Sequence, residues 1–306
     1  MNYAHDFHAG NFADVFKHIF LTRILLYLCQ KPAPLRFIET HAGSGLYDLS
    51  GEAAARGGEW RGGVERLLDG PLEPAAQALI QPYADIVAPL VYPKSLERDA
   101  GGKVGSTFRH PALSGDPPHY PGSPLIAAAL LRPQDRLIAC ELHPAAFERL
   151  KANLHKDRRA KAIGIDGYNG LKAFIPPVER RGLVLIDPPF EAPDEFARLA
   201  RALPAGARKW PGGVFMLWHP VKDRAGADAF AAALGRDFAA SGVGSTLRLE
   251  LGVGPVAVRG PLARNGLIIA NPPFCLEAEA RLILPSLSRR LGGAQGDHLI
   301  ARLDGA

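Results

Sequence analysis

The sequence of 306 residues has little cysteine, little methionine and no large excess of either charge. Its three cysteines are too few for a disulfide framework, which favours a reducing, cytoplasmic compartment. The longest apolar runs are far shorter than the ~20 residues that cross a bilayer, so we expect no membrane partner. The N-terminal residues lack a basic region followed by an apolar stretch, so we expect no signal peptide.

The composition is otherwise that of an ordinary globular protein. Hydrophobic residues make up 47% and charged residues 22%, which excludes a disordered, collagenous or coiled-coil protein. The length allows two domains, or one domain with an insertion. A formal net charge of +5 permits a nucleic-acid partner without requiring one. His5 and His8 lack the further ligands of a zinc motif, so we expect no metal.

Periodicity predicts alternating helices and strands. Apolar residues recur at intervals of three and four over residues 12–30, which indicates an amphipathic helix. Short apolar runs bounded by turn residues then predict strands at 35–39, 136–140, 161–165, 183–186 and 213–217. Helical patterns between the later strands lie at 144–156, 168–174 and 193–203. This alternation indicates βαβ units and a parallel sheet.

Two further strands close the predicted sheet. Residues 246–251 alternate polar residues with leucine, which is typical of a strand with one face in water. Residues 266–270 form another apolar run. We therefore expect an α/β fold with a mostly parallel, seven-stranded sheet that has an antiparallel edge.

The connection between the first two strands is unusually long. It has about 100 residues, whereas a βαβ unit needs ~30. We therefore expect residues 1–306 to form a single domain in which residues 46–120 are inserted. Within the insertion, residues 73–90 have a helical pattern interrupted by Pro82, and residues 93–118 are rich in glycine and proline, as loops are.

Polar residues follow the first three strands, where open α/β sheets bind ligands. Glu39-Thr-His-Ala-Gly-Ser-Gly45 is a glycine-rich turn that we expect to lead into a helix, and it places His41 at this edge. Glu141 could accept hydrogen bonds from a ribose diol. Asp166 could accept from an adenine amino group, and Gly167 would leave room for the ring. Together they suggest an adenosine-type cofactor.

Asp187-Pro-Pro-Phe190, after the fourth strand, is the most specific motif. The adenine amino group is a poor nucleophile, so an enzyme that alkylates it must accept hydrogen bonds from both N–H groups. The Asp187 carboxylate and the Pro188 carbonyl could be these acceptors, and proline offers no N–H to compete. Phe190 could stack on a flipped base. A rigid proline turn without function is the plainer alternative.

Asn271-Pro-Pro-Phe274 has the same form. It follows a late strand of the antiparallel edge, which would place it at the opposite end of the sheet. We therefore assign the chemistry to Asp187.

These motifs resemble a known family, the bacterial 23S rRNA (adenine-N6)-methyltransferases called ribosomal RNA large subunit methyltransferase J. The similarity covers most of the chain. Its matching segments are Phe7-His-Ala-Gly-Asn11, Ala13-Asp-Val-Phe-Lys-His18, Thr40-His-Ala-Gly43, Tyr120-Pro-Gly-Ser-Pro-Leu125, Glu141-Leu-His-Pro144, Lys156-Asp157, Asp166-Gly167, Arg180-Arg-Gly-Leu183, Asp187-Pro-Pro189, Leu217-Trp218 and Asn271-Pro-Pro273.

The resemblance implies a Rossmann-like class I methyltransferase fold with a small helical insertion after the first strand, and S-adenosylmethionine as cofactor. It implies that the catalytic residue is Asp187 and that Tyr3 and Phe190 meet the RNA. Residues 1–30 would be a tail and helix over the active site. The implied cofactor contacts are His18, His41, Ser123, Glu141, Asp166, Gly167 and Asp187.

Two departures from the family pattern concern Phe190, which replaces the usual Tyr, and residues 93–118, which are longer than expected. The implied partner is 23S rRNA, naked or in early assembly intermediates, and the protein is expected to be a monomer. Two alternatives are an adenine-N6 methyltransferase acting on DNA and a non-catalytic nucleic-acid binding or uptake protein. A possible phosphate-contacting surface is a basic run of Arg149, Lys151, Lys156, Arg158, Arg159 and Lys161.

Overall fold

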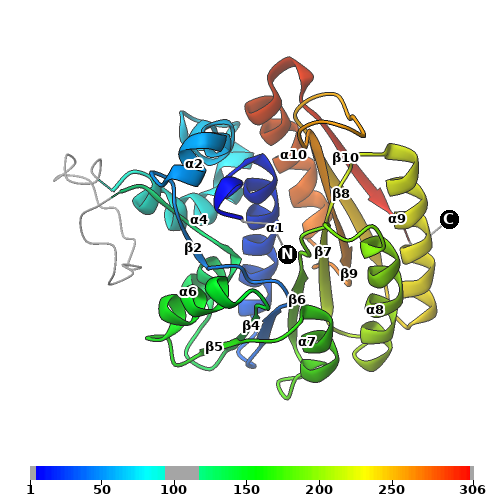
Figure 1. The fold of residues 1–306 in the computed structure, drawn as a ribbon. Coiled ribbons are helices and arrows are strands. Elements are labelled where there is room, and N and C mark those ends of the chain that lie inside the picture. The colour runs from blue at the N-terminus through cyan, green and yellow to red at the C-terminus, as the bar shows by residue number, and fades with distance from the viewer. Residues whose placement is uncertain (1–4, 94–116, 304–306) are drawn as a thin grey trace.

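The computed structural model describes residues 5–93 and 117–303, and its centre is an eight-stranded sheet (Figure 1). The order of the strands across it is β10-β8-β9-β7-β6-β1-β4-β5. Their bounds are β1 Arg36–Glu39, β4 Arg136–Cys140, β5 Ala160–Ile163, β6 Gly182–Ile186, β7 Val214–Pro220, β8 Thr246–Gly252, β9 Arg264–Ala270 and β10 Asp297–Arg302. The expectation of seven strands is wrong by one, because β10 adds an edge strand to β8.

The direction of the strands divides the sheet into two parts. The pairs β5·β4, β4·β1, β1·β6 and β6·β7 are parallel. The pairs β7·β9, β9·β8 and β8·β10 are antiparallel, so the antiparallel edge is confirmed. The carboxyl ends of five parallel strands therefore meet along one edge of the sheet.

Helices cover both faces of the sheet. Those on one face are α1 (Phe12–Cys29), α5 (Ser123–Leu130) and α10 (Leu276–Gly292); those on the other are α7 (Gly167–Phe174), α8 (Glu195–Lys209) and α9 (Arg224–Ala240), and α6 (Pro144–Leu154) packs beside β5. Strand β6 serves both layers, because Leu183 and Leu185 pack on the first and Val184 and Ile186 on the second. None of the helices in the described ranges is long and apolar enough to span a membrane.

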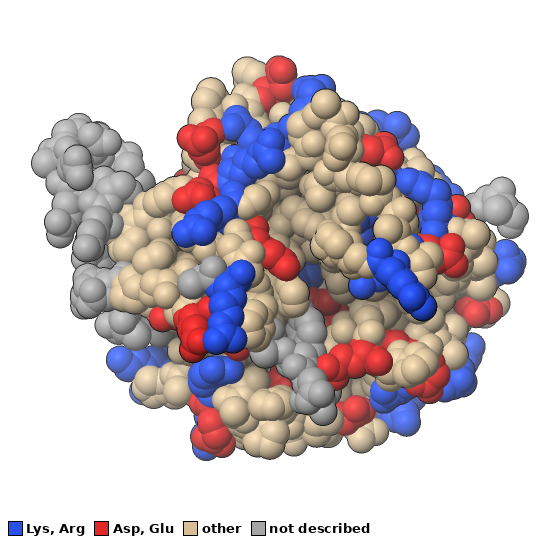
Figure 2. All heavy atoms as spheres, turned by 45° about the horizontal axis from the view of Figure 1, so that its top comes forward, with Lys and Arg blue, Asp and Glu red and all other residues tan. Residues whose placement is uncertain are grey.

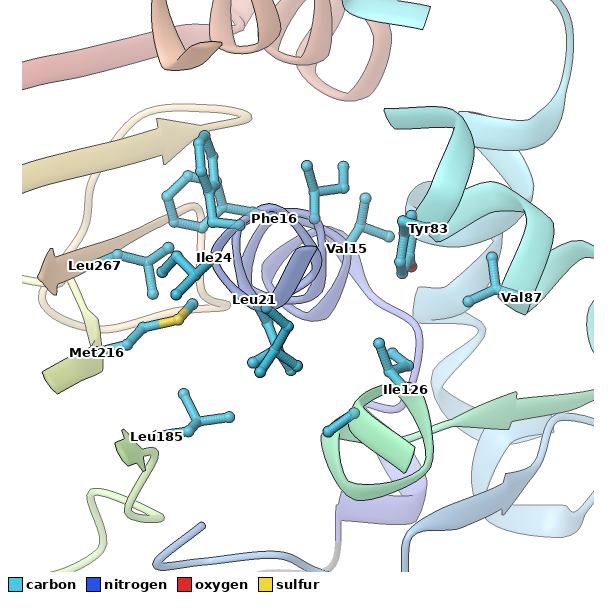
Figure 3. Packing of buried hydrophobic residues seen from close by; sticks show 14 of the residues in the cluster. Val15, Phe16, Leu21, Ile24, Tyr83, Val87, Ile126, Leu185, Met216 and Leu267 are labelled. Atoms are coloured by element: carbon cyan, nitrogen blue, oxygen red, sulfur yellow. The ribbon is translucent and has the colours of Figure 1, made fainter. Parts of the chain in front are cut away.

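Helix α1 is buried on all sides instead of being amphipathic. Fourteen of its 18 residues are buried. Ile24 lies toward Met216 and Leu267 of the sheet, whereas Val15 lies toward Tyr83 (Figure 3). The expected polar side is missing because the inserted segment covers the face that the sheet leaves open.

That covering segment begins and ends in a two-stranded ribbon. Strand β2 (Leu46–Asp48) pairs antiparallel with β3 (His119–Pro121), so the two ends of the insertion lie together. The helix expected directly after the glycine turn is therefore wrong, because residues 46–48 pair as a strand. Between the ribbon strands lie α2 (Glu52–Gly57), a π-helical turn η2 (Arg61–Glu65), α3 (Arg66–Leu68) and α4 (Pro74–Val91).

Helix α4 is continuous, although Pro82 was expected to interrupt it. A proline inside a helix removes one hydrogen bond and costs about 3 kcal/mol. The buried residues Ile80, Tyr83 and Val87 pack in the same core as α1 and hold both sides of the proline in place. The expected loop at 93–118 lies almost wholly outside the described residues.

The polar face of β8 is buried, so the expectation of a strand with one wet face is also wrong. Glu250 is fully buried and accepts hydrogen bonds from Arg248 and, at 2.5 Å, from Arg264 Nε. Arg248 reaches Asp228 of α9 at 2.6 Å. These ion pairs supply the partners that water would otherwise provide.

Because α1 is packed on all sides, shortening one of its buried side chains should destabilise the whole molecule. We expect Ile24→Ala to lower the free energy of unfolding by roughly 2–5 kcal/mol, since it leaves a cavity between helix and sheet. Urea unfolding followed by circular dichroism measures this loss. Lys31→Ala, at an exposed position just beyond the same helix, is the control and should change little. Equal unfolding midpoints for the two variants would contradict the packing role.

Candidate active site

A cleft of about 860 Å³ opens where the parallel strands end. This volume is in the usual range for small-molecule sites. Its walls include residues from the ends of β1, β4, β5, β6 and β7, together with the start of α1. Figure 2 shows the hollow in the surface, with lysine and arginine side chains on both sides of it. The residues from four strand ends that lie in it are His41, Glu141, Asp166, Gly167 and Asp187.

The first two strand ends are joined through Glu141. Its Oε2 accepts a hydrogen bond of 2.7 Å from the Gly43 amide, and its Oε1 accepts one of 2.7 Å from the His143 amide. Gly43 has a φ of 61°, and a Cβ there would collide with the Tyr47 hydroxyl. The carboxylate is thereby fixed, while each oxygen keeps a lone pair that could accept from a vicinal diol.

Asp166 caps the next helix. Its Oδ1 accepts hydrogen bonds of 3.1 Å from the amides of Tyr168 and Asn169, which leaves Oδ2 toward Arg198 at 3.8 Å. Gly167 is needed for a reason that the sequence did not show. A Cβ at this position would lie 2.4 Å from the Thr40 carbonyl, so the glycine makes room for this chain's own β1 turn.

Two groups beside the first strand have strongly shifted pKa values. Burial lowers the pKa of His41 to about 4, and its Nδ1 is hydrogen-bonded to Thr40 Oγ1 at 2.8 Å, so the ring is neutral near pH 7. Burial raises the pKa of Glu39 to about 8, although a hydrogen bond from the Ser123 hydroxyl opposes the rise. Ser123 lines the cleft, but its hydroxyl is already engaged with Glu39.

His18 contributes an unsatisfied atom to the cleft wall. Its Nδ1 is hydrogen-bonded to the Tyr120 hydroxyl at 2.7 Å, and burial holds its pKa well below the usual range. Its Nε2 is buried and, within the described residues, has no partner; the same is true of Glu39 Oε2. Buried polar atoms normally have partners, and His18 lines the cleft, so its Nε2 indicates that a polar ligand completes the site.

The carboxylate of Asp187 is held by a lysine that the sequence analysis did not single out. Lys17 Nζ lies 2.5 Å from Asp187 Oδ2 and 2.8 Å from Asp14 Oδ1. Burial alone would lower the pKa of Lys17, but the two carboxylates outweigh it and hold that pKa well above its usual range. His5 Nε2 adds a contact of 2.9 Å to Asp14.

A signal for Lys17 was available. It lies inside the matched segment Ala13–His18, on a helix whose neighbouring residues are apolar, and a lysine among buried residues is rare unless it is paired. Its partner could not be identified, because Asp187 is 170 residues away along the chain.

Aromatic side chains form the wall beyond Asp187. The Phe190 ring lies 5.0 Å from Phe196 and 5.8 Å from Trp218, between ring centres. All of Asp187–Phe190 lines the cleft, as does Trp218. Tyr3 lies outside the described residues.

Asn271 is at the other end of the sheet, as predicted. It follows β9, whose last residue pairs with Phe215 near the start of β7. Its side-chain amide donates to the carbonyls of Pro211 and Gly213, at 2.6 and 2.8 Å. Asn271-Pro-Pro-Phe274 is therefore a structural turn.

The basic run near α6 serves several purposes. Arg149 donates to Ser44 Oγ at 2.9 Å and lines the cleft. Arg159 is bonded to Asp157 and to the carbonyls of Ala128 and Leu131, so its role is structural. Exposed cations that could still meet phosphate are Lys151, Lys156, Arg158 and Lys161. In residues 5–93 and 117–303, no three His, Cys, Asp or Glu side chains gather as metal ligands would.

The donor set fits S-adenosylmethionine: a fixed carboxylate for a diol, an acid for an adenine amino group, and the unsatisfied Nε2 of His18 in the same cleft. Together with the strand order, it defines the class of the protein as a Rossmann-like, S-adenosylmethionine-dependent methyltransferase.

Comparison with known proteins narrows the class to a family. Residues 32–104 and 106–302 match the family model described as "Ribosomal RNA large subunit methyltransferase D, RlmJ". Two relatives named ribosomal RNA large subunit methyltransferase J are each 36% identical. The Escherichia coli K12 relative aligns over 97% of this chain and 96% of its own, and the Haemophilus influenzae Rd relative over 95% and 94%. The chain belongs to the ribosomal RNA large subunit methyltransferase J family.

A solved structure agrees with this membership. A crystal structure of a Legionella pneumophila protein aligns with a TM-score of 0.77 and 32% identity, covering 96% of this chain and 98% of that one. The similarity thus extends over the sheet and the insertion together.

The raised pKa of Glu39 should make stability depend on pH. Its carboxyl titrates at about 8 in the folded protein against 4.5 in the reference state, so the unfolded chain loses this proton first. The contribution of Glu39 to stability is therefore full below pH 4.5 and falls as pH rises to about 8. Glu39→Gln stays neutral, and we expect its urea midpoint to decline less between pH 5 and pH 8 than that of the wild type. Exposed Glu148→Gln should decline as the wild type does; parallel curves for all three proteins would refute the assignment.

Proposed function

We propose that the protein transfers a methyl group from S-adenosylmethionine to the N6 amino group of an adenosine in 23S rRNA. The observation that carries the proposal is Asp187-Pro-Pro-Phe190 at the end of β6, inside the cleft and beside the strand ends that suit an adenosine-type cofactor. The names of the two relatives support large-subunit rRNA as the substrate.

The cofactor supplies an electrophilic methyl group when it is bound. We assign Glu141 to its ribose hydroxyls and Asp166 to its adenine amino group, with Gly167 beside the latter. We assign the amino-acid end to the region of His18, His41 and Ser123, where the unsatisfied Nε2 of His18 supports the assignment. Asp187 lies against the same ligand.

The chain's own part in the reaction is to hold the target amino group. Asp187 accepts one N–H and the Pro188 carbonyl accepts the other, which draws the nitrogen toward tetrahedral geometry. Lys17 engages only Oδ2 of Asp187, so Oδ1 is available for this bond. Phe190 stacks on the flipped base, and Tyr3 contacts the RNA. The proton that leaves the alkylated nitrogen passes to the carboxylate, and rate enhancement comes mainly from positioning and electrostatics.

The organisation proposed for the chain follows from this site. Residues 1–306 form one methyltransferase domain; residues 1–30 are the tail and helix over the active site, and residues 46–120 are the inserted subdomain. The burial of α1 and the pairing of β2 with β3 support this division. We propose a cytoplasmic monomer that acts on 23S rRNA, naked or in early assembly intermediates.

Two other functions make different predictions. An adenine-N6 methyltransferase acting on DNA would use the same motif, but both relatives are named for ribosomal RNA. A non-catalytic nucleic-acid binding or uptake protein would give no reason for Asp187 to be held beside a cofactor-type cleft. Methylation assays on protein-free large-subunit rRNA and on duplex DNA separate all three.

Removing the acceptor should remove the chemistry. We expect Asp187→Asn to reduce methyl transfer to protein-free large-subunit rRNA by at least about 100-fold, because the amide no longer offers a charged acceptor. Mass spectrometry of N6-methyladenosine measures this. Asp194→Asn, at an exposed position on the same connection, should keep wild-type turnover. Normal turnover by Asp187→Asn would exclude the proposed role.

Glu141 offers an independent test of the cofactor site. Glu141→Gln replaces a diol acceptor by an amide, and hydrogen bonds to charged groups contribute about 1.5–3 kcal/mol. We expect a roughly tenfold or greater loss of affinity for S-adenosylhomocysteine in a calorimetric titration, without loss of folding. Glu148→Gln on α6 is the matched control. An unchanged affinity would remove Glu141 from the cofactor site.

A further inference from the structure

A second hollow of about 510 Å³ is lined mainly by residues of α7 and α8, two helices that pack against each other. Figure 1 shows where these helices lie in the fold. Leu171, Ala202, Ala205 and Gly206 give it a small, apolar floor. Four cations line it, Lys172 from α7 and Arg198, Arg201 and Lys209 from α8. Asp166 is the one carboxylate among the lining residues. We call this hollow the α7–α8 groove.

The cations of the groove contrast with two arginines of α10 that are held in ion pairs. Arg281 lies 2.7 Å from Glu277, and Arg289 lies 3.8 Å from Glu73. In contrast, no carboxylate of the described chain lies within ion-pair distance of Lys172, Arg201 or Lys209. All three are exposed, so their charge is available to an anionic ligand.

The groove is continuous with the active-site cleft. Asp166, Tyr168 and Arg198 line both. The guanidinium of Arg198 lies 4.2 Å from the centre of the Tyr168 ring, and it is 3.8 Å from both Asp166 and Glu195. The stacked Arg198 and Tyr168 side chains lie at the boundary between the cleft and the groove. A ligand that extends from the cleft on this side therefore passes over them into the groove.

The positions on α8 give the groove its length. Arg198, Arg201, Ala205 and Lys209 recur on one face of the helix, and the first and last are about 16 Å apart along its axis. That distance is longer than a single phosphate group. The floor offers no side-chain hydrogen-bond donor and no aromatic ring; among the lining residues, an aromatic ring and an amide come from Tyr168 and Asn169 at the start of α7.

We propose that the α7–α8 groove binds the phosphate backbone of the RNA strand adjacent to the target adenosine. This inference rests on the proposed function, which supplies the RNA. Cations that contact phosphate position a nucleic acid and make its binding depend on salt.

The test is a triple variant, Lys172→Gln, Arg201→Gln and Lys209→Gln, compared with a control of equal charge loss, Lys31→Gln, Arg236→Gln and Arg281→Gln. Binding of protein-free large-subunit rRNA is measured over a range of salt concentrations. We expect the groove variant to bind at least about tenfold more weakly near 0.15 M salt, with a salt slope smaller by up to about 2, since each lost contact on single-stranded RNA removes ~0.7. Its affinity for S-adenosylhomocysteine should equal that of the wild type.

The outcomes separate the groove from the proposed function. If the wild type methylates rRNA and the groove variant binds RNA like the control, the groove inference is overturned while the function stands. If the wild type neither binds nor methylates rRNA, both fall together. Pyrophosphate is the probe for a small-anion site: its binding, lost in the groove variant while RNA affinity is unchanged, would overturn the RNA assignment.

Discussion

The ion pair between Lys17 and Asp187 is the contact around which the active site is arranged. A buried ammonium group is costly unless its partners are fixed, so this lysine demands two carboxylates at defined positions. Asp14 is one turn away on the same helix, whereas Asp187 comes from the end of β6. The pair therefore joins the first helix of the chain to the motif on which the chemistry depends.

This constraint explains why the first helix must be buried on all sides. A helix with one wet face would let water reach Lys17 and weaken its hold on Asp187, because charge interactions are stronger where water is excluded. Residues of α4 and β3 close that face, with Tyr83 and Tyr120 hydrogen-bonded to each other at 2.9 Å beside His18. The insertion thus contributes to the active site by keeping water away from α1 and Lys17.

The two ends of the sheet show the same proline motif in different uses. At the carboxyl edge, Asp187 forms an ion pair with Lys17 and lines a cleft. At the opposite edge, the Asn271 side chain donates hydrogen bonds to the carbonyls of Pro211 and Gly213. The direction of the strand decides between them. Strand β6 runs parallel to its neighbours and β9 runs against β7, so two similar local sequences point to opposite ends of the sheet.

Local sequence was sufficient to predict the strands before His41, Glu141, Asp166 and Asp187, the antiparallel edge and the placement of Asp187 and Asn271 at opposite ends of the sheet, because apolar period and turn residues act over a few positions. The partner of Lys17, the burial of Glu250 and the eighth strand were beyond it, since each depends on a contact with another part of the chain: Asp187, Arg264 and β8. Gly167 has a further role that local sequence did not show, because a Cβ there would meet the Thr40 carbonyl. Residue types and their spacing determined the chemistry available to this chain; only the folded structure decided which charges meet, because pairing and the exclusion of water are properties of three-dimensional packing.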